Sequence, residues 1–125
     1  MHLPEWVLGD REYLAALWIL TTPALAHKGV LRHVHLDGGA VHGIDFLALM
    51  DEAKPWSDGE KLLVRAAWCL FNGGGMFYLD QAMATLSDGN LLRVLEAVFI
   101  RRPGLADFFQ VDVSPARIVA NLTDD

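Results

Sequence analysis

Histidine and aspartate side chains gather in one stretch of the chain and have the chemistry of metal ligands. They lie between positions 27 and 45: His27, His33, His35, Asp37, His42 and Asp45. Imidazoles and carboxylates bind zinc and iron, and His33 and His35 would share one face of a strand but point to nearly opposite sides of a helix. One hypothesis is therefore a metal site made of His33, His35, His42 and Asp45. The spacing matches no established zinc motif, so partly exposed structural histidines are the favoured interpretation.

The chain offers little other catalytic chemistry. Its single cysteine, Cys69, lies between Trp68 and Leu70 in an apolar helical pattern, and we interpret it as a core residue because no activating base is placed beside it. A single cysteine also excludes an intramolecular disulfide, which fits a reducing compartment. The serines have roles as helix caps: Ser57, Ser87 and Ser114. We therefore predict no catalytic residue and no cofactor, and the hypothesis of an enzyme depends only on the histidines.

The glycine run at 73–75 has the composition of a phosphate-binding loop but not its context. Such a loop follows a strand and is followed by Lys and then Ser or Thr. Here the run follows a helical pattern and is followed by Met76. A helix end explains it better than a nucleotide site.

These residues sit in what we interpret as an internal repeat with a shift of 35 positions. The shift aligns Thr22 with Ser57, Asp37-Gly38-Gly39 with Asn72-Gly73-Gly74, Val41 with Met76, Ile44 with Leu79, and Asp45 with Asp80. The repeat predicts helix 23–36, strand 41–43 and helix 45–53 in the first copy. It predicts helix 57–72, strand 76–78 and helix 80–85 in the second. A β-hairpin turning at Asp37-Gly38, with 30–36 paired to 40–44, is the alternative for the first copy.

Two helix-loop-short strand-helix units resemble the topology of a paired EF-hand lobe, in which the two short strands pair between the loops. Calcium loops need oxygen ligands at alternating positions and a closing glutamate. The two loops here read Asp37-Gly38-Gly39-Ala40 and Asn72-Gly73-Gly74-Gly75. The closing positions hold Ala48 and Met83. The resemblance thus implies the topology without calcium binding.

Further helices are predicted around these units. Asp10 caps a helix to about Thr22, and Ser57 and Glu60 form a capping box at the start of the helix that Asn72 and Gly73 end. Ser87 starts a long helix to Arg102 that is apolar on nearly all sides, and we expect it to organise the core. A connector over 105–113 and a short helix over 116–122 complete a mainly α, single-domain bundle covering residues 1–125.

The apolar surplus suggests what the bundle does. Hydrophobic residues make up 53% of the chain, and the 87–102 helix has more apolar surface than one small core needs. We expect Leu91, Leu95 and Val98 to face the core, and Trp68, Leu95 and Phe99 to be candidate interface residues. The favoured function is a non-catalytic helical module for protein interaction or regulation that forms a homodimer, and a metal-dependent protein is the alternative.

Charge and hydropathy exclude other classes of function. The net charge is −6 and the basic residues are scattered, which disfavours nucleic-acid binding. The longest uncharged stretch, 14–26, is too short to cross a bilayer, and the first residues do not resemble a signal peptide. We therefore expect a cytoplasmic protein.

Overall fold

The computed structural model describes residues 3–36 and 43–123 of the chain. Its elements, in order, are η1 (Glu5–Gly9), α1 (Arg11–Leu20), η2 (Val30–His33), β1 (Val34–His35), β2 (Gly43–Ile44), α2 (Phe46–Glu52), α3 (Asp58–Asn72), α4 (Leu79–Thr85), α5 (Asp88–Arg101), α6 (Pro103–Asp107) and α7 (Pro115–Thr123). The expectation of a mainly helical protein is confirmed. None of the described helices combines the length and the apolar character needed to cross a membrane.

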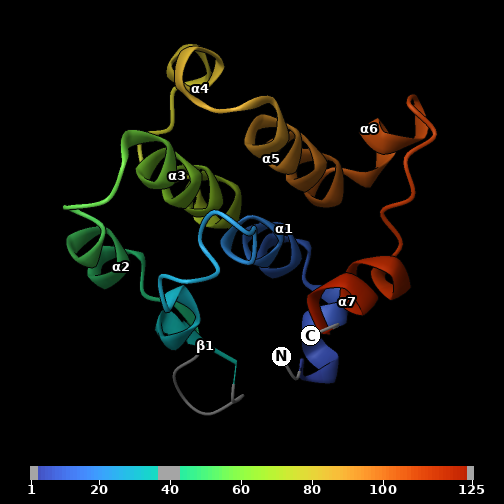
Figure 1. The fold of residues 1–125 in the computed structure, drawn as a ribbon. Helices are drawn as coiled ribbons and strands as arrows, with labels where there is room; N and C mark the ends of the chain where they lie inside the picture. The colour runs from blue at the N-terminus through green and yellow to red at the C-terminus, as the bar shows by residue number, and fades with distance from the viewer. Residues whose placement is uncertain (1–2, 37–42, 124–125) are drawn as a thin grey trace.

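Helix α1 is the centre of the fold. Figure 1 shows it surrounded by α3, α5 and α7, and every side chain from Tyr13 to Leu20 is buried. The Asp10 carboxylate accepts a hydrogen bond from Tyr13 N–H at 3.0 Å and starts the helix. Burying each large aliphatic side chain contributes about 1.5–3 kcal/mol, so this helix supplies much of the stability. The prediction that the 87–102 helix organises the core is wrong, because α1 is buried on all sides whereas the outward side of α5 exposes Leu92 and Leu95.

Helices α3 and α5 begin where the serines predict. Ser57 Oγ accepts from Glu60 N–H at 3.2 Å, and Glu60 Oε1 accepts from Ser57 N–H at 3.0 Å, which completes the capping box. Gly73, at φ 83°, ends α3 in the left-handed conformation. Ser87 caps α5 through Asn90 N–H at 3.2 Å. These local signals are confirmed.

The first copy of the repeat contains part of the alternative pairing, over residues 34–35 and 43–44, and the predicted turn at Asp37-Gly38 lies outside the described residues. Val34 pairs with Ile44 and His35 pairs with Gly43 in an antiparallel ladder. The prediction of a helix over 23–36 is wrong: turns follow α1, Gly29 adopts φ 67°, and only the short η2 precedes the strand. The left-handed Gly29 interrupts the segment, and the β-branched residues Val30 and Val34 disfavour a continuous helix here.

The second copy contains no strand. Residues 76–78 are irregular and Met76 adopts φ 50°, so the predicted strand is wrong. The chain here turns over the Trp68 ring, and a Cβ added to Gly75 would lie 2.8 Å from the Arg65 carbonyl oxygen. Of the other predicted strand, residues 41 and 42 lie outside the described residues, and Gly43 pairs with β1 instead. Among the described residues, the pairing between loops that an EF-hand-like lobe requires is therefore not formed.

The C-terminal segment is more ordered than the predicted connector. Pro103 starts the short helix α6, and the turn after it places Gln110 at φ 54°. Arg11 Nη1 donates to the Val113 carbonyl oxygen at 2.8 Å, which ties this segment to the start of α1. Helix α7 then packs on α1 and η1. Its bounds, Pro115–Thr123, are close to those of the helix predicted over 116–122.

Candidate functional site

The outward side of α5 is an exposed apolar stripe. Leu92 is 55% exposed and Leu95 is 47% exposed. Together with Asp88 and Phe99 they follow the spacing i, i+4, i+7, i+11, which places all four on one side of a helix with 3.6 residues per turn. The side chains that cover α1 lie on the opposite side of α5: Val94, Ala97 and Ile100.

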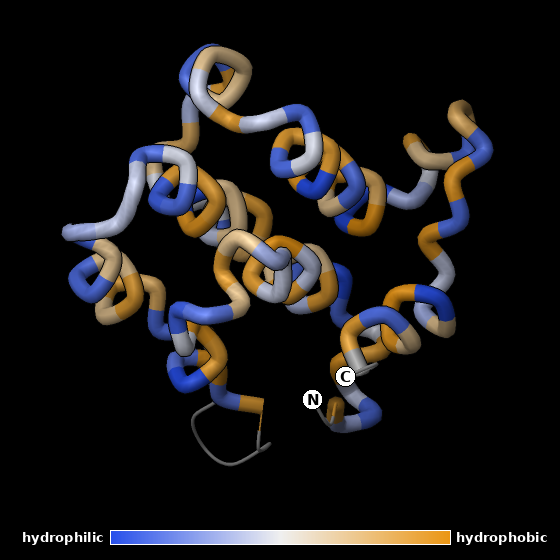
Figure 2. Tube along the Cα trace, in the orientation of Figure 1, coloured by the Kyte–Doolittle hydropathy of each residue, from blue (hydrophilic) through white to orange (hydrophobic). Residues whose placement is uncertain are grey.

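The turn after α6 extends this stripe with aromatic side chains. Phe108 is 85% exposed and Phe109 is 63% exposed, and the Phe109 ring lies 5.3 Å from the Phe99 ring. Backbone hydrogen bonds from Phe108 N–H to Leu105 O and from Phe109 N–H to Ala106 O hold the turn. Figure 2 shows hydrophobic residues in α6 and this turn at the right-hand edge of the molecule. We call Leu92, Leu95, Phe99, Phe108 and Phe109 the α5–α6 apolar surface.

Charged residues lie at both ends of the stripe. Asp88 is exposed in the first turn of α5, and Arg102 is exposed directly after its last turn. Negative charge at a helix N-terminus and positive charge at a C-terminus both stabilise the helix. The result is an apolar surface with an acidic end and a basic end.

The structure brings two of the three predicted interface residues together. Leu95 and Phe99 both belong to the α5–α6 apolar surface, although Phe99 is buried beneath Phe109. Trp68 does not join them, because its ring stacks on Phe46 of α2 at 5.5 Å and is covered by the glycines at 74 and 75. The sequence analysis missed Phe108 and Phe109, although an adjacent pair between Asp107 and Gln110 was a visible signal of exposure.

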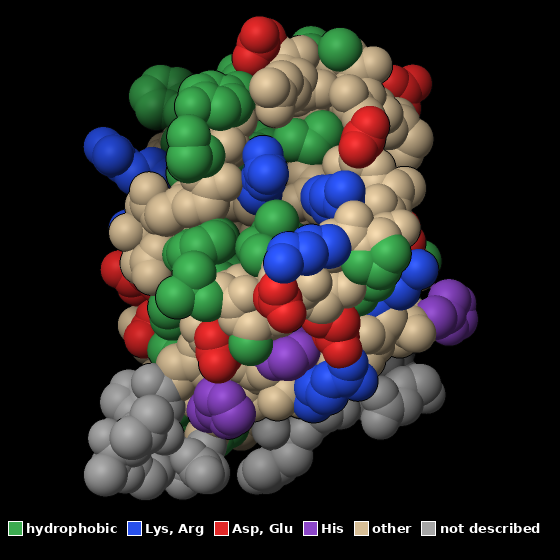
Figure 3. Space-filling model, turned by 90° about the vertical axis from the view of Figure 1, so that its left-hand side faces the viewer, with side chains coloured by type: hydrophobic (Ala, Val, Ile, Leu, Met, Phe, Trp, Pro, Cys, Tyr) green, Lys and Arg blue, Asp and Glu red, His purple; other side chains and the backbone are tan. Residues whose placement is uncertain are grey.

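A second group of exposed apolar side chains surrounds α4. Leu79 and Met83 are 64% and 63% exposed and lie one turn apart, and Met76 and Tyr78 precede them. On the face drawn in Figure 3, hydrophobic side chains gather towards the upper end, where α4 lies in Figure 1. This group lacks the aromatic pair that marks the α5–α6 apolar surface.

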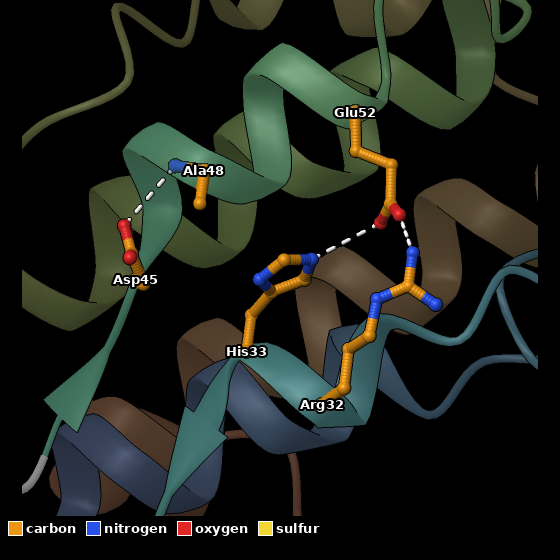
Figure 4. Close-up of polar contacts among 5 residues, drawn as sticks. All are labelled: Arg32, His33, Asp45, Ala48 and Glu52. Carbon is orange, nitrogen blue, oxygen red and sulfur yellow. Dashed lines mark hydrogen bonds and ion pairs between the residues drawn. The ribbon is translucent and has the colours of Figure 1, made fainter.

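The histidine stretch forms a polar cluster between η2 and α2. His33 Nε2 lies 3.1 Å from Glu52 Oε2, and Arg32 forms an ion pair with the same carboxylate. Figure 4 shows the His33 ring and the Arg32 guanidinium converging on Glu52, while the Asp45 carboxylate points to Ala48. Figure 3 shows histidine side chains among acidic and basic ones towards the lower end of that face. The sequence analysis did not include Glu52, which is the residue that joins this cluster.

The predicted metal ligands are not assembled by the described residues. Asp45 Oδ1 accepts from Ala48 N–H at 3.1 Å and caps α2, while the Asp45 N–H donates to the His33 carbonyl oxygen at 2.9 Å. His35 is exposed on β1, and His42 lies outside the described residues. Within residues 3–36 and 43–123, no three His, Cys, Asp or Glu side chains are grouped as metal ligands. The metal hypothesis stays a prediction that zinc titration tests.

Comparison with known proteins identifies no relative of this chain. No protein-family model, no curated protein and no solved structure matches the chain.

Proposed function

We propose that this protein is a non-catalytic interaction module that forms a homodimer through the α5–α6 apolar surface. The observation that carries the proposal is the exposure of Phe108 and Phe109 in the turn that packs on Phe99 of α5, the helix whose outward side exposes Leu92 and Leu95. Aromatic side chains are enriched at the centres of interfaces, and contiguous exposed apolar patches mark association sites. The contacts inside the fold do not account for this exposure, whereas a partner surface does.

A second copy is the partner that the charges favour. In a two-fold dimer the same surface meets itself, and a two-fold axis perpendicular to α5 makes α5 of one protomer run antiparallel to α5 of its partner. Asp88 of each protomer then faces the Arg102 end of the other, and the leucines and phenylalanines meet between them. The acidic and basic ends of one surface thus complement each other only in this orientation.

The proposal includes a cytoplasmic location. Cys69 is a free, partly buried thiol, and reducing conditions keep such a thiol from forming a disulfide between copies. The dimer contact that we propose contains no cysteine. Association should therefore be the same with and without a reducing agent.

Light scattering coupled to size-exclusion chromatography tests the proposal at micromolar protein. We expect the mass of two chains for the unmodified protein and of one chain for Leu92→Glu combined with Phe108→Ser. Leu47, 74% exposed on α2, supplies the matched control, and Leu47→Glu should remain dimeric. A single-chain mass for the unmodified protein, or equal loss of mass in the control, would overturn the proposal.

A further inference from the structure

A cavity of about 480 Å³ lies at the C-terminal end of α1, apart from the α5–α6 apolar surface. Five elements or turns contribute to its wall: Leu20 and Thr21, Ala26 and Gly29, Val30 to Arg32, Arg93, and Asn121 with Leu122. The volume is in the range of sites that hold small organic ligands. No aspartate or glutamate belongs to the described wall, although the whole chain is acidic.

Arg93 is the distinctive residue of this wall. Its guanidinium lies over the Trp18 ring, 4.1 Å from the ring centroid. Nε donates to the Trp18 carbonyl oxygen at 2.6 Å and Nη2 donates to Thr21 Oγ1 at 3.2 Å. These contacts fix the guanidinium and use two of its five N–H donors.

The fixed guanidinium has no direct counter-ion among the described residues. The Glu96 carboxylate acts on it electrostatically, but Glu96 Oε1 accepts from Trp18 Nε1 at 3.3 Å. Burial lowers the pKa of Arg93, and this effect outweighs the attraction of Glu96. Arg32, the other cation of the wall, is paired with Glu52. A half-buried arginine of this kind gains most from an anion that shares its cavity.

The remaining wall determines what kind of anion fits. Leu20, Val30 and Leu122 are buried there, and Leu31 is 41% exposed at the rim. Apolar walls favour a ligand with an apolar body, and a guanidinium with spare N–H donors favours a planar carboxylate. A strongly hydrated anion such as phosphate would need several unpaired cations, and the described wall supplies one.

We infer that this cavity binds a small organic carboxylate, with the carboxylate at Arg93 and the apolar body against Leu20, Val30 and Leu122. Octanoate is the probe, measured by calorimetry and by the melting temperature. We expect octanoate to bind and to raise the melting temperature, and 1-octanol to bind about tenfold more weakly, because it lacks the charge that pairs with the guanidinium.

Variants locate the site. Arg93→Gln should weaken octanoate binding about tenfold, while Arg65→Gln, which changes an arginine of α3 outside the cavity, should leave it unchanged. If Arg93→Gln does not fold, Leu31→Asp supplies the test: a carboxylate at the rim should repel octanoate about tenfold, and Leu47→Asp on α2 should not. Absence of octanoate binding, equal binding of 1-octanol, displacement by equimolar inorganic phosphate, or equal effects in the control variants would overturn the inference.

Discussion

The Phe109 ring covers the Phe99 ring at 5.3 Å with an angle of 32° between their planes. Phe99 is therefore 7% exposed, while Leu95, one turn earlier on the same side of α5, is 47% exposed. The expectation that Leu95 faces the core is wrong, because Leu95 lies on the side of α5 opposite the buried Val94, Ala97 and Ile100. A residue from the turn after α6 decides which part of α5 is core and which part is surface.

This contact predicts opposite effects for two alanine variants. Phe99→Ala should lower the free energy of unfolding by about 3–5 kcal/mol, because it empties a buried ring position. Leu95→Ala should change it by no more than about 0.5 kcal/mol in the monomer, as is usual for surface positions. Urea unfolding monitored by circular dichroism measures both. A larger loss for Leu95→Ala than for Phe99→Ala would contradict the burial that we describe.

The charged ends of α5 predict a charge-reversal experiment on the dimer. Asp88→Arg should weaken association because it places two cationic ends together, and Arg102→Asp should weaken it for the converse reason. The double variant should recover much of the lost association, because the pair is restored with its signs exchanged. Sedimentation equilibrium at low and high salt measures the three dissociation constants. Additive losses in the double variant would exclude the antiparallel arrangement.

The capping box of α3 predicts a pH-dependent stability. The hydrogen bond from Ser57 N–H lowers the pKa of Glu60. This contribution is therefore complete above the ordinary glutamate pKa, about 4.3, and is lost as the pH falls through the lower folded-state value. Ser57→Ala should cost about 1 kcal/mol at pH 7. Glu60→Gln should keep the cap and flatten the acid limb of the stability curve, whereas an unchanged limb would contradict the assignment.

Two glycines predict opposite signs for the same substitution. Gly75→Ala should destabilise by about 1–3 kcal/mol, because Gly75 has φ 83° and its added Cβ would meet the Arg65 carbonyl oxygen. Gly89→Ala should stabilise by about 0.4–1 kcal/mol, because its position in α5 is helical and no atom lies within 4 Å of the added Cβ. Thermal unfolding of both variants gives the comparison. Equal shifts would show that the turn over Trp68 is not held as described.

The histidine cluster predicts little response to zinc. His33 pairs with the Glu52 carboxylate, and the Asp45 carboxylate caps α2. Zinc at modest excess should therefore leave the melting temperature unchanged. A zinc-dependent rise that is lost in His33→Ala and in His35→Ala would instead support the metal hypothesis. His27→Ala is the matched control for the loss of an exposed histidine.

The sequence predicted those features that depend on neighbouring residues. Ser57, Ser87 and Asp45 each bond to a backbone N–H three positions later, so the starts of three helices could be read from short patterns. Residues 23–36 and 76–78 could not, because the hairpin depends on pairing with β2 and the second turn depends on the Trp68 ring. The polar cluster of Glu52, Arg32 and His33 was missed for the same reason. Its members come from η2 and α2, and no spacing in the sequence indicates that these two elements are in contact.

The central position of α1 also has a consequence for the order of events during synthesis. Helix α1 is synthesised before α3, α5 and α7, which cover it, and α7 is made about a hundred residues later. Until then Leu14, Leu17 and Ile19 have no complete enclosure, so the nascent chain presents an apolar helix to its surroundings until α7 has been made. Its native contacts are predominantly distant in sequence, which favours slow, late consolidation and recognition of residues 11–20 by chaperones that bind apolar segments.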